Sequence, residues 1–313
     1  MLLALKIDVD TLRGTREGVP RLSEALRRHD AGGTFLFSLG PDHTGRAIRR
    51  VFRPGFFGKV QRTSVVRHYG IRTLLYGTLL PGPDIGVRTA DLMRRVRDEG
   101  FEVGVHAWDH VKWQDGLDGA CAEWTAREMG RACERFTEIF KEAPRVHGAA
   151  GWQMNVHALR LTQALGFDYC SDGRGAYPHV PVWNAELIRC PQLPTTLPTL
   201  DELIGTGGID EGNVAGRLLA STASPPESPA FAGHVYTLHA ELEGMRLALV
   251  FDQLLAGWKA QGYRLVPMRT LYESLTFLLP RCEVGPGRVP GRSGTLFSQR
   301  DEFLGDVDLA QAA

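Results

Sequence analysis

Two pairs of side chains in this sequence have the types and the spacing for joint chemistry. Asp8 and Asp10 end the stretch LALKIDVD, and in an extended strand both side chains point to the same side. His106 and His110 in HAWDH are four residues apart, which places them on one face of a helical turn. Two imidazoles at this spacing can chelate one divalent ion. With Asp10 as an oxygen ligand, such a site would keep an open position suited to hydrolysis.

Each pair also has a purely structural interpretation. The HxxxH spacing occurs on solvated helix faces, and loop aspartates commonly cap the turn that follows them. Asp8 and Asp10 could cap the loop TLRGTREG and pair with Arg13 or Arg16. A bound dication would instead explain how two carboxylates lie side by side next to the core. Spacing alone leaves both interpretations open.

Strand-like and helix-like segments alternate along the chain. Apolar runs predict strands at residues 3–9, 33–40, 101–107, 145–150, 167–171, 186–194, 233–240 and 263–268. Helical periodicity lies between them, at residues 19–26, 89–99, 120–141, 155–165, 247–261 and 270–279. Such alternation indicates parallel strands joined by helical crossovers. Because about seven units occur without a GxGxxG or GxxxxGK(S/T) loop, we expect an α/β fold, a distorted (β/α)7-type barrel.

Polar side chains follow several of the predicted strands. These residues are Asp8, Asp10, His106, His110, Ser171, Asp172 and His239. In an α/β barrel, the carboxyl ends of the strands form the edge at which active sites are assembled. We therefore expect these side chains to meet at one edge of the sheet. A lone histidine at a strand end can also be a core residue, and that alternative applies to His239.

Composition limits the class of protein. The chain has 313 residues, 36 acidic and 36 basic side chains, and 43% hydrophobic residues, which is typical of a globular protein. Its five cysteines are scattered without a CxxC pair, which argues against a disulfide framework or a structural zinc site. The start MLLALKIDVD is too short for a signal peptide, and no run approaches the roughly 18 apolar residues of a membrane span. These features predict a cytoplasmic protein, or one attached to a membrane from the cytosolic side.

Residues 41–88 form an insertion between the second strand and the next α/β unit. No acidic residue lies between Asp42 and Asp84, while residues 43–83 carry eight basic side chains. Aromatic residues and leucines lie among them, which suits an amphipathic segment on an anionic membrane surface. The side chains expected to meet lipid are Arg49, Arg50, Arg53, Phe56 and Phe57. The alternatives are a solvated basic face and a nucleic-acid surface, and we do not expect nucleic acid to be a partner.

We expect one catalytic domain at residues 1–280, which includes this insertion, followed by a separate C-terminal tail. The tail, residues 281–313, contains the run GPGRVPGRSG. Because glycine and proline interrupt regular structure, this composition predicts an irregular segment.

Four short motifs resemble those of a known family. IDVDT, HAWDH, YCSDGRG and YTLHAE are similar to the motifs of the metal-dependent polysaccharide deacetylases, the NodB-like carbohydrate esterases. The resemblance extends from about residue 4 to 280 and implies a distorted barrel. It also implies that Asp8 is the catalytic base, that His239 is the general acid, and that Asp10, His106 and His110 hold one divalent metal ion. Zinc suits these ligands best, and cobalt or manganese would also be accepted.

The third motif departs from the family pattern. The family usually has an arginine there that holds the catalytic base, whereas this chain has HGAAGWQ at residues 147–153. We expect Arg174 of SDGRG to contact Asp8 instead. Asp172, Trp108 and Trp152 are further candidates for binding substrate or supporting the site, although core packing would also account for the tryptophans.

Longer strings narrow the resemblance. TLRGTREGVPRL and LPTTLPTLDE are similar to the deformylases that act on undecaprenyl-phosphate-linked 4-deoxy-4-formamido-L-arabinose, in lipid A modification and polymyxin resistance. This implies a hydrolase of a linear amide C–N bond that meets a lipid-linked formamido sugar at the cytosolic face of the bacterial inner membrane. Two alternatives remain: an N-deacetylase of a peptidoglycan- or chitin-like saccharide, and an inactive membrane-bound glycolipid-binding protein.

Overall fold

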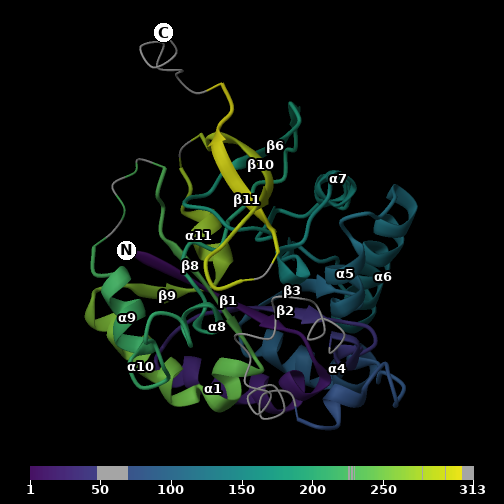
Figure 1. Cartoon of the computed structure of the whole chain (residues 1–313), viewed down its shortest axis with the longest axis horizontal. Coiled ribbons are helices and arrows are strands. Elements are labelled where there is room, and N and C mark those ends of the chain that lie inside the picture. Colours follow the sequence, from purple (N-terminus) through teal and green to yellow (C-terminus); the bar gives the residue numbers. More distant parts are fainter. Residues whose placement is uncertain are drawn as a thin grey trace.

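A parallel β-sheet forms the centre of the computed structural model, which describes residues 1–47, 70–224, 226, 228, 230–276, 278–292 and 294–304. The strands run in the order β5-β4-β3-β2-β1-β8, and β9 pairs with the first residues of β1. They are β1 Leu2–Val9, β2 Thr34–Ser38, β3 Glu102–Ala107, β4 Val146–His147, β5 Tyr169–Cys170, β8 His234–His239 and β9 Arg264–Val266. The sheet curls like half a barrel with helices outside it (Figure 1), which confirms the expected α/β fold class.

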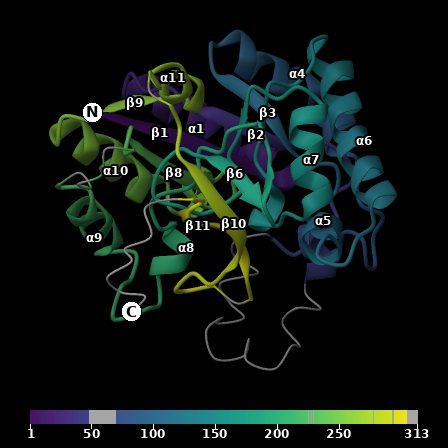
Figure 2. The ribbon, with the colours of Figure 1, turned by 90° about the horizontal axis from the view of Figure 1, so that it is seen from above.

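Helices surround the sheet, and the longer ones cover its outer face. The longer ones are α1 Val19–Arg28, α4 Ile85–Asp98, α6 Ala122–Phe140 and α10 Ala248–Ala260. Shorter ones are α5 His110–Gly116, α7 Val156–Ala164, α8 Leu200–Leu203, α9 Val214–Ser221 and α11 Met268–Glu273. Of these, α11 packs inside the curl of the sheet through Met268 and Leu271. Single turns of tighter or wider helix are η1 Gly14–Gly18, η2 Thr44–Ala47, η3 Thr73–Leu75, η4 Ala150–Trp152 and η5 Leu242–Arg246. Figure 2 shows α4 and α6 near one end of the sheet, at the right, and α9 and α10 near the other end, at the left. Within the described residues, no helix is long and apolar enough to cross a membrane.

The two faces of β1 enter different surroundings, because successive side chains of a strand point to opposite sides. One face joins the large apolar core beneath the helices, through Leu3, Leu5, Ile7 and Val9. The other face begins with Ala4, which packs in a second cluster inside the curl of the sheet. Lys6 and Asp8 follow Ala4 on this inner face and are 0% and 3% exposed. The inner face of β1 therefore carries buried charges toward the edge where the strand ends.

An extended segment bridges the two ends of the open sheet. Residues 191–197 run between β5 and β8: the amide of Leu193 donates to the carbonyl of Cys170 at 2.7 Å, and that of Thr196 donates to Val235 at 3.0 Å. Five of these seven residues belong to LPTTLPTLDE. The strand expected at residues 186–194 is wrong in extent, because only Glu186–Leu187 form a strand, β7, and it lies in a second sheet.

The prediction of an irregular tail is wrong for the described part of residues 281–313. Arg281–Gly287 form β10 and Leu296–Glu302 form β11, an antiparallel pair, and β10 also pairs with β6, Val180–Trp183. The second sheet has the order β11-β10-β6-β7. Val284 and Phe297 are buried in a small cluster with Leu159 and Ile188. The glycines and prolines lie at the end of β10 and in the loop after it, so they interrupt the hairpin without preventing it.

Candidate active site

The expected metal ligands come together at the carboxyl end of the sheet. Nε2 of His106 lies 3.2 Å from Oδ1 of Asp10, and Nε2 of His110 lies 3.5 Å from the same oxygen. Asp10 follows β1, His106 belongs to β3, and His110 begins α5, whose first turn is capped by the side chain of Asp109. One ligand atom from each of the three residues lies within 4.8 Å of the other two. Three of the four residues that sequence spacing singled out therefore form one cluster. The helical turn expected for HAWDH is wrong, because His106 belongs to a strand and only His110 belongs to a helix.

The donor set of this cluster fits a divalent cation. Nδ1 of His106 lies 2.6 Å from the carbonyl oxygen of Gly148. Because a carbonyl only accepts, Nδ1 carries a proton, and Nε2 would present its lone pair to a bound cation once its own proton is released. Oδ1 of Asp10 is buried and has no hydrogen-bond donor among the described residues. Two imidazole nitrogens and a carboxylate oxygen directed at one point are the ligands of three-coordinate hydrolytic metal sites.

The charge state of Asp10 agrees with a ligand role. Burial alone raises the pKa of this carboxyl, but the nearby imidazoles of His110 and His106 hold its pKa well below the usual range. The carboxylate is therefore ionised at neutral pH, as a metal ligand must be.

Lys6, rather than Arg174, contacts Asp8. Nζ of Lys6 lies 3.3 Å from Oδ2 of Asp8, and both side chains are buried. The expected contact from Arg174 is wrong, because its guanidinium donates to Oε1 of Glu202 at 2.7 Å and to the carbonyl of Leu197 at 3.0 Å. Lys6 is already on the inner face of β1, two residues from Asp8, so no cation from the third motif is needed.

Gly148 makes room for this ion pair. A Cβ at this position would lie 2.9 Å from Cε of Lys6 and 2.3 Å from Cδ1 of Leu36. Both distances are shorter than ordinary van der Waals contacts. Gly148 therefore leaves space for the Lys6 side chain, while its carbonyl orients His106.

His239 ends β8 beside Asp8, and the two residues are paired in the strand register. Burial by itself lowers the pKa of the His239 imidazole, but the carboxylates of Asp201, Asp10 and Asp8 raise it, and the net shift of the pKa is upward. Its backbone amide donates to Oε2 of Glu243 at 2.9 Å. The protonated imidazole is favoured here, which suits a proton donor. Asp201 was not among the residues expected at the site, although it lies within LPTTLPTLDE.

Glu241 is another site residue that motif reasoning missed. Its Oε1 accepts the amide of Thr11 at 2.9 Å, the hydroxyl of Thr11 at 2.7 Å and the amide of Asp10 at 3.2 Å. Burial and the charge of Asp10 raise the pKa of Glu241 to about 8. The carboxyl holds the loop that carries Asp10. The sequence feature that could have identified Glu241 is its position two residues after His239, in TLHAELEG.

Asp172 follows β5 and binds the chain segment at the end of β4. Its carboxylate accepts from Nδ1 of His147 at 2.7 Å, from the amide of Ala149 at 3.0 Å and from Nε2 of Gln192 at 3.0 Å. These bonds fix the segment whose Gly148 carbonyl orients His106. Asp172 is fully buried.

The two candidate tryptophans lie in different places. Trp152 is 1% exposed, and its ring centroid lies 6.3 Å from that of His239. The Cζ of Arg292, from the β10–β11 loop, lies 4.4 Å from the Trp152 ring. The Trp108 ring instead lies near Arg131 and Arg135 of α6, at 5.9 and 5.2 Å, and packs against the main core. Trp152 is thus brought to the catalytic edge, whereas the Trp108 side chain points away from it.

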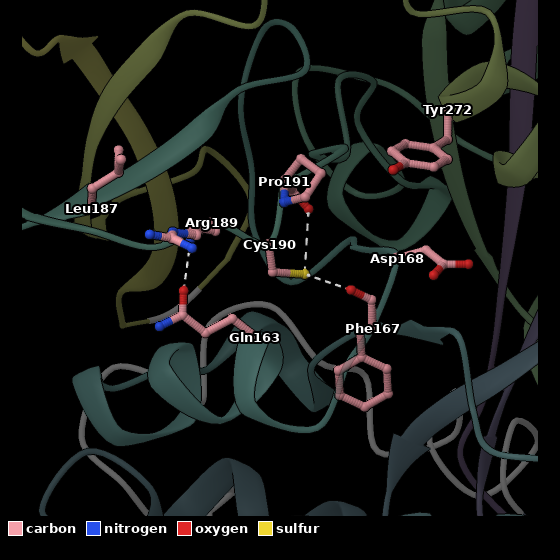
Figure 3. A pocket seen from close by; sticks show the side chains of 8 residues that line it. All are labelled: Gln163, Phe167, Asp168, Leu187, Arg189, Cys190, Pro191 and Tyr272. Carbon is pink, nitrogen blue, oxygen red and sulfur yellow. Dashed lines mark hydrogen bonds between the residues drawn. The ribbon is translucent and has the colours of Figure 1, made fainter.

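The expected membrane contacts Arg49, Arg50, Arg53, Phe56 and Phe57 lie outside the described residues. A separate hollow of about 630 Å³ lies beside α7 and the start of β5 (Figure 3). It is lined by Gln163, Phe167, Asp168, Leu187, Arg189, Cys190, Pro191 and Tyr272. None of the expected site residues lines this hollow.

Comparison with known proteins agrees with this site. A family model described as polysaccharide deacetylase matches residues 4–170. A "probable 4-deoxy-4-formamido-L-arabinose-phosphoundecaprenol deformylase" of Shewanella sediminis is 37% identical over 297 residues, which is 95% of this chain and 94% of that protein. A protein of the same description from Wigglesworthia glossinidia brevipalpis is 29% identical, over 92% of this chain and 98% of that protein.

The fold is also found among solved structures. A polysaccharide deacetylase structure from Mycobacterium smegmatis superposes with a TM-score of 0.59 at 18% identity, over 87% of this chain and 88% of that one. Together, the family match and the identity to the Shewanella protein establish a hydrolase that acts on amide C–N bonds. The chain belongs to the polysaccharide deacetylase family and, within it, to the 4-deoxy-4-formamido-L-arabinose-phosphoundecaprenol deformylases.

Proposed function

We propose that this protein hydrolyses the N-formyl group of undecaprenyl-phosphate-linked 4-deoxy-4-formamido-L-arabinose, which gives the free 4-amino sugar and formate. The observation that carries the proposal is the meeting of Asp10, His106 and His110 with Asp8 and His239 at one sheet edge. The substrate is inferred from the two relatives, which are described as probable deformylases of this lipid-linked sugar. The product would serve lipid A modification and resistance to polymyxin.

In this proposal, Asp10, His106 and His110 hold one divalent ion, with zinc as the first choice for two nitrogens and one oxygen. The ion, when bound, supplies Lewis-acid polarisation of the formyl carbonyl and lowers the pKa of water. Asp8 takes a proton from the water that adds to the formyl carbon, a general-base role worth about 10²- to 10⁴-fold. His239 gives a proton to the sugar nitrogen as the C–N bond breaks, so the amine leaves neutral.

The supporting residues keep these groups in place. Lys6 orients the Asp8 carboxylate, Asp172 fixes the segment that orients His106, and Arg174 braces α8 through Glu202. Trp152 forms a wall of the site beside His239. Trp108 is assigned no contact with the sugar.

We also propose that the protein associates peripherally with the cytosolic face of the bacterial inner membrane, where a lipid-linked substrate resides. The described part of the 41–88 insertion supports this. Ile71 and Leu79 are 70% and 81% exposed, in a stretch where basic residues are not balanced by acidic ones. Exposed apolar side chains among basic ones suit an anionic interface.

Mass spectrometry of the lipid-linked formamido sugar before and after incubation with zinc-loaded protein tests the proposed reaction. We expect a mass loss corresponding to exchange of formyl for hydrogen, together with released formate. Asp8→Asn is the matched control, because it should bind zinc without turnover. If the protein deacetylates peptidoglycan or chitin oligomers and does not deformylate the sugar lipid, the N-deacetylase alternative is correct. If it binds the sugar lipid tightly and releases no product, it is an inactive binding protein.

A further inference from the structure

A groove between η1 and α4 has an unusual charge. It has a volume of about 420 Å³ and is lined by Arg16, Val87, Arg88, Thr89, Ala90, Asp91, Leu92, Arg94 and Arg95. Four arginines and one aspartate give the lining a net charge of +3. Asp91 is already paired with Arg94. Among the residues that the structure describes, no carboxylate lies within ion-pair distance of Arg16, Arg88 or Arg95.

Two further arginines of α4 have partners. Arg97, outside the groove, pairs with Asp98 and donates to the carbonyl of Phe140, and Arg94, within it, donates to the carbonyl of Ile139. Among the described residues, Arg16, Arg88 and Arg95 are therefore the groove arginines whose guanidinium charges no carboxylate compensates. Guanidinium groups bind phosphate oxygens in bidentate geometry.

One end of the groove lies near the catalytic edge of the sheet, and the groove extends from there along α4. Its η1 side begins four residues after Asp10. The first turn of α4 is held at the end of β2, because the amide of Ile85 donates to the carbonyl of Gly40 at 2.8 Å. An anion in the groove would thus bind on the same side of the molecule as the candidate metal centre.

Apolar side chains beside the groove indicate what carries the anion. Val87 lines the groove and is 67% exposed. Leu79, in the segment that leads into α4, is 81% exposed. Apolar side chains next to a basic site match the boundary between lipid head groups and acyl chains, whereas a site for a small free anion gains nothing from them.

We propose that this groove binds the phosphate head group of an anionic phospholipid. Binding there would hold the catalytic edge near the bilayer, which contains the lipid-linked substrate of the proposed function. This inference rests on the proposed function, because that function is the reason for the protein to bind a membrane. Arg16, Arg88 and Arg95 supply the charge, and Val87 enters the acyl boundary.

Binding to vesicles of phosphatidylglycerol and phosphatidylcholine tests the proposal, with the full chain and without turnover. The double variant Arg88→Gln/Arg95→Gln should lose about 30-fold in affinity, because each basic residue near an anionic surface contributes about 5-fold. The matched control is Arg217→Gln/Arg264→Gln, which removes two exposed charges from α9 and β9, on the side away from α4 (Figures 1 and 2). The control should lose less than about 2-fold, since charges beyond the Debye length of about 8 Å are screened.

Three results would overturn the proposal: no loss in the groove variant, an equal loss in both variants, or binding of inorganic phosphate at the groove with unchanged vesicle affinity. Circular dichroism and urea unfolding confirm that each variant is folded. Wild-type protein that binds vesicles through the groove but releases no formate would refute the proposed function and leave this inference standing.

Discussion

Replacing Lys6 by methionine is the most direct test of how this site is built. The Lys6 Nζ–Asp8 Oδ2 distance of 3.3 Å corresponds to a Coulomb attraction of about 5 kcal/mol at an effective dielectric constant of 20. Methionine keeps much of the volume but leaves Asp8, which is 3% exposed, as an unpaired buried carboxyl. Losing one partner of a buried pair costs about 3–5 kcal/mol, so we expect the free energy of unfolding to fall by that amount.

Catalysis should fall as well, because Asp8 would no longer be held by the charge of Lys6, its ion-pair partner. If about 1.5–3 kcal/mol of that Coulomb attraction acts on the transition state, kcat/KM for formate release should drop by roughly 10- to 150-fold. Zinc affinity should stay near that of wild type, because Lys6 contacts Asp8 and not the ligand Asp10. A general loss of structure would lower zinc affinity as well. Zinc affinity therefore distinguishes a local effect on Asp8 from a general loss of structure.

A double-mutant cycle provides the decisive control. Lys6→Met/Asp8→Asn removes both charges, so its free energy of unfolding should exceed that of Lys6→Met alone. Urea unfolding with zinc chelated measures all four proteins. The ion-pair argument fails if the double variant is no more stable than Lys6→Met, or if Lys6→Met keeps kcat/KM within about 3-fold of wild type.

Three further predictions concern the ligands, the packing and the pH dependence. Asp8→Asn should bind zinc by calorimetry and lose about 10²- to 10⁴-fold in kcat/KM, whereas His106→Ala should lose both; zinc binding by His106→Ala would contradict the ligand assignment. Gly148→Ala should cost about 1–3 kcal/mol in urea unfolding through its clashes with Leu36 and Lys6, and wild-type stability would contradict the close approach. Burial lowers the pKa of His179 from 6.5 to about 4, so the unfolded chain binds more protons between these values. Stability is then full above pH 6.5 and falls by about 3 kcal/mol as pH drops to 4; His179→Gln should show a shallower slope, and an unchanged slope would contradict it.

The ligand cluster was predictable because its members follow the ends of strands. Asp10 follows β1 and His106 lies near the end of β3, and the carboxyl ends of parallel strands meet at one edge. His110 joins them as the first residue of α5, so it shares no helical turn with His106. Lys6 was predictable from strand alternation, since it lies two residues before Asp8 on the same face of β1. It was missed because the family pattern directed attention to Arg174, whose actual partner, Glu202, lies 28 residues further along the chain.

The C-terminal hairpin was not predictable from local sequence, because its stability comes from distant partners. Strand β10 pairs with β6, about 100 residues earlier, and nothing in GPGRVPGRSG indicates that pairing. Arg292 is likewise far from its partners, which lie 90 and 91 residues earlier in the chain. Its Nε donates to Glu202 at 2.6 Å and its Nη2 to Asp201 at 3.0 Å.

These contacts connect the hairpin to catalysis. Arg292 lies over Trp152 and binds Asp201, and Asp201 is the carboxylate that most favours a protonated His239. The family model ends at residue 170, so His239, the proposed general acid, and Asp201 and Arg292 beside it lie in later parts of the chain. The metal side of the site is therefore built from the early strands, and the proton-donor side is built where β8, α8 and the C-terminal hairpin meet.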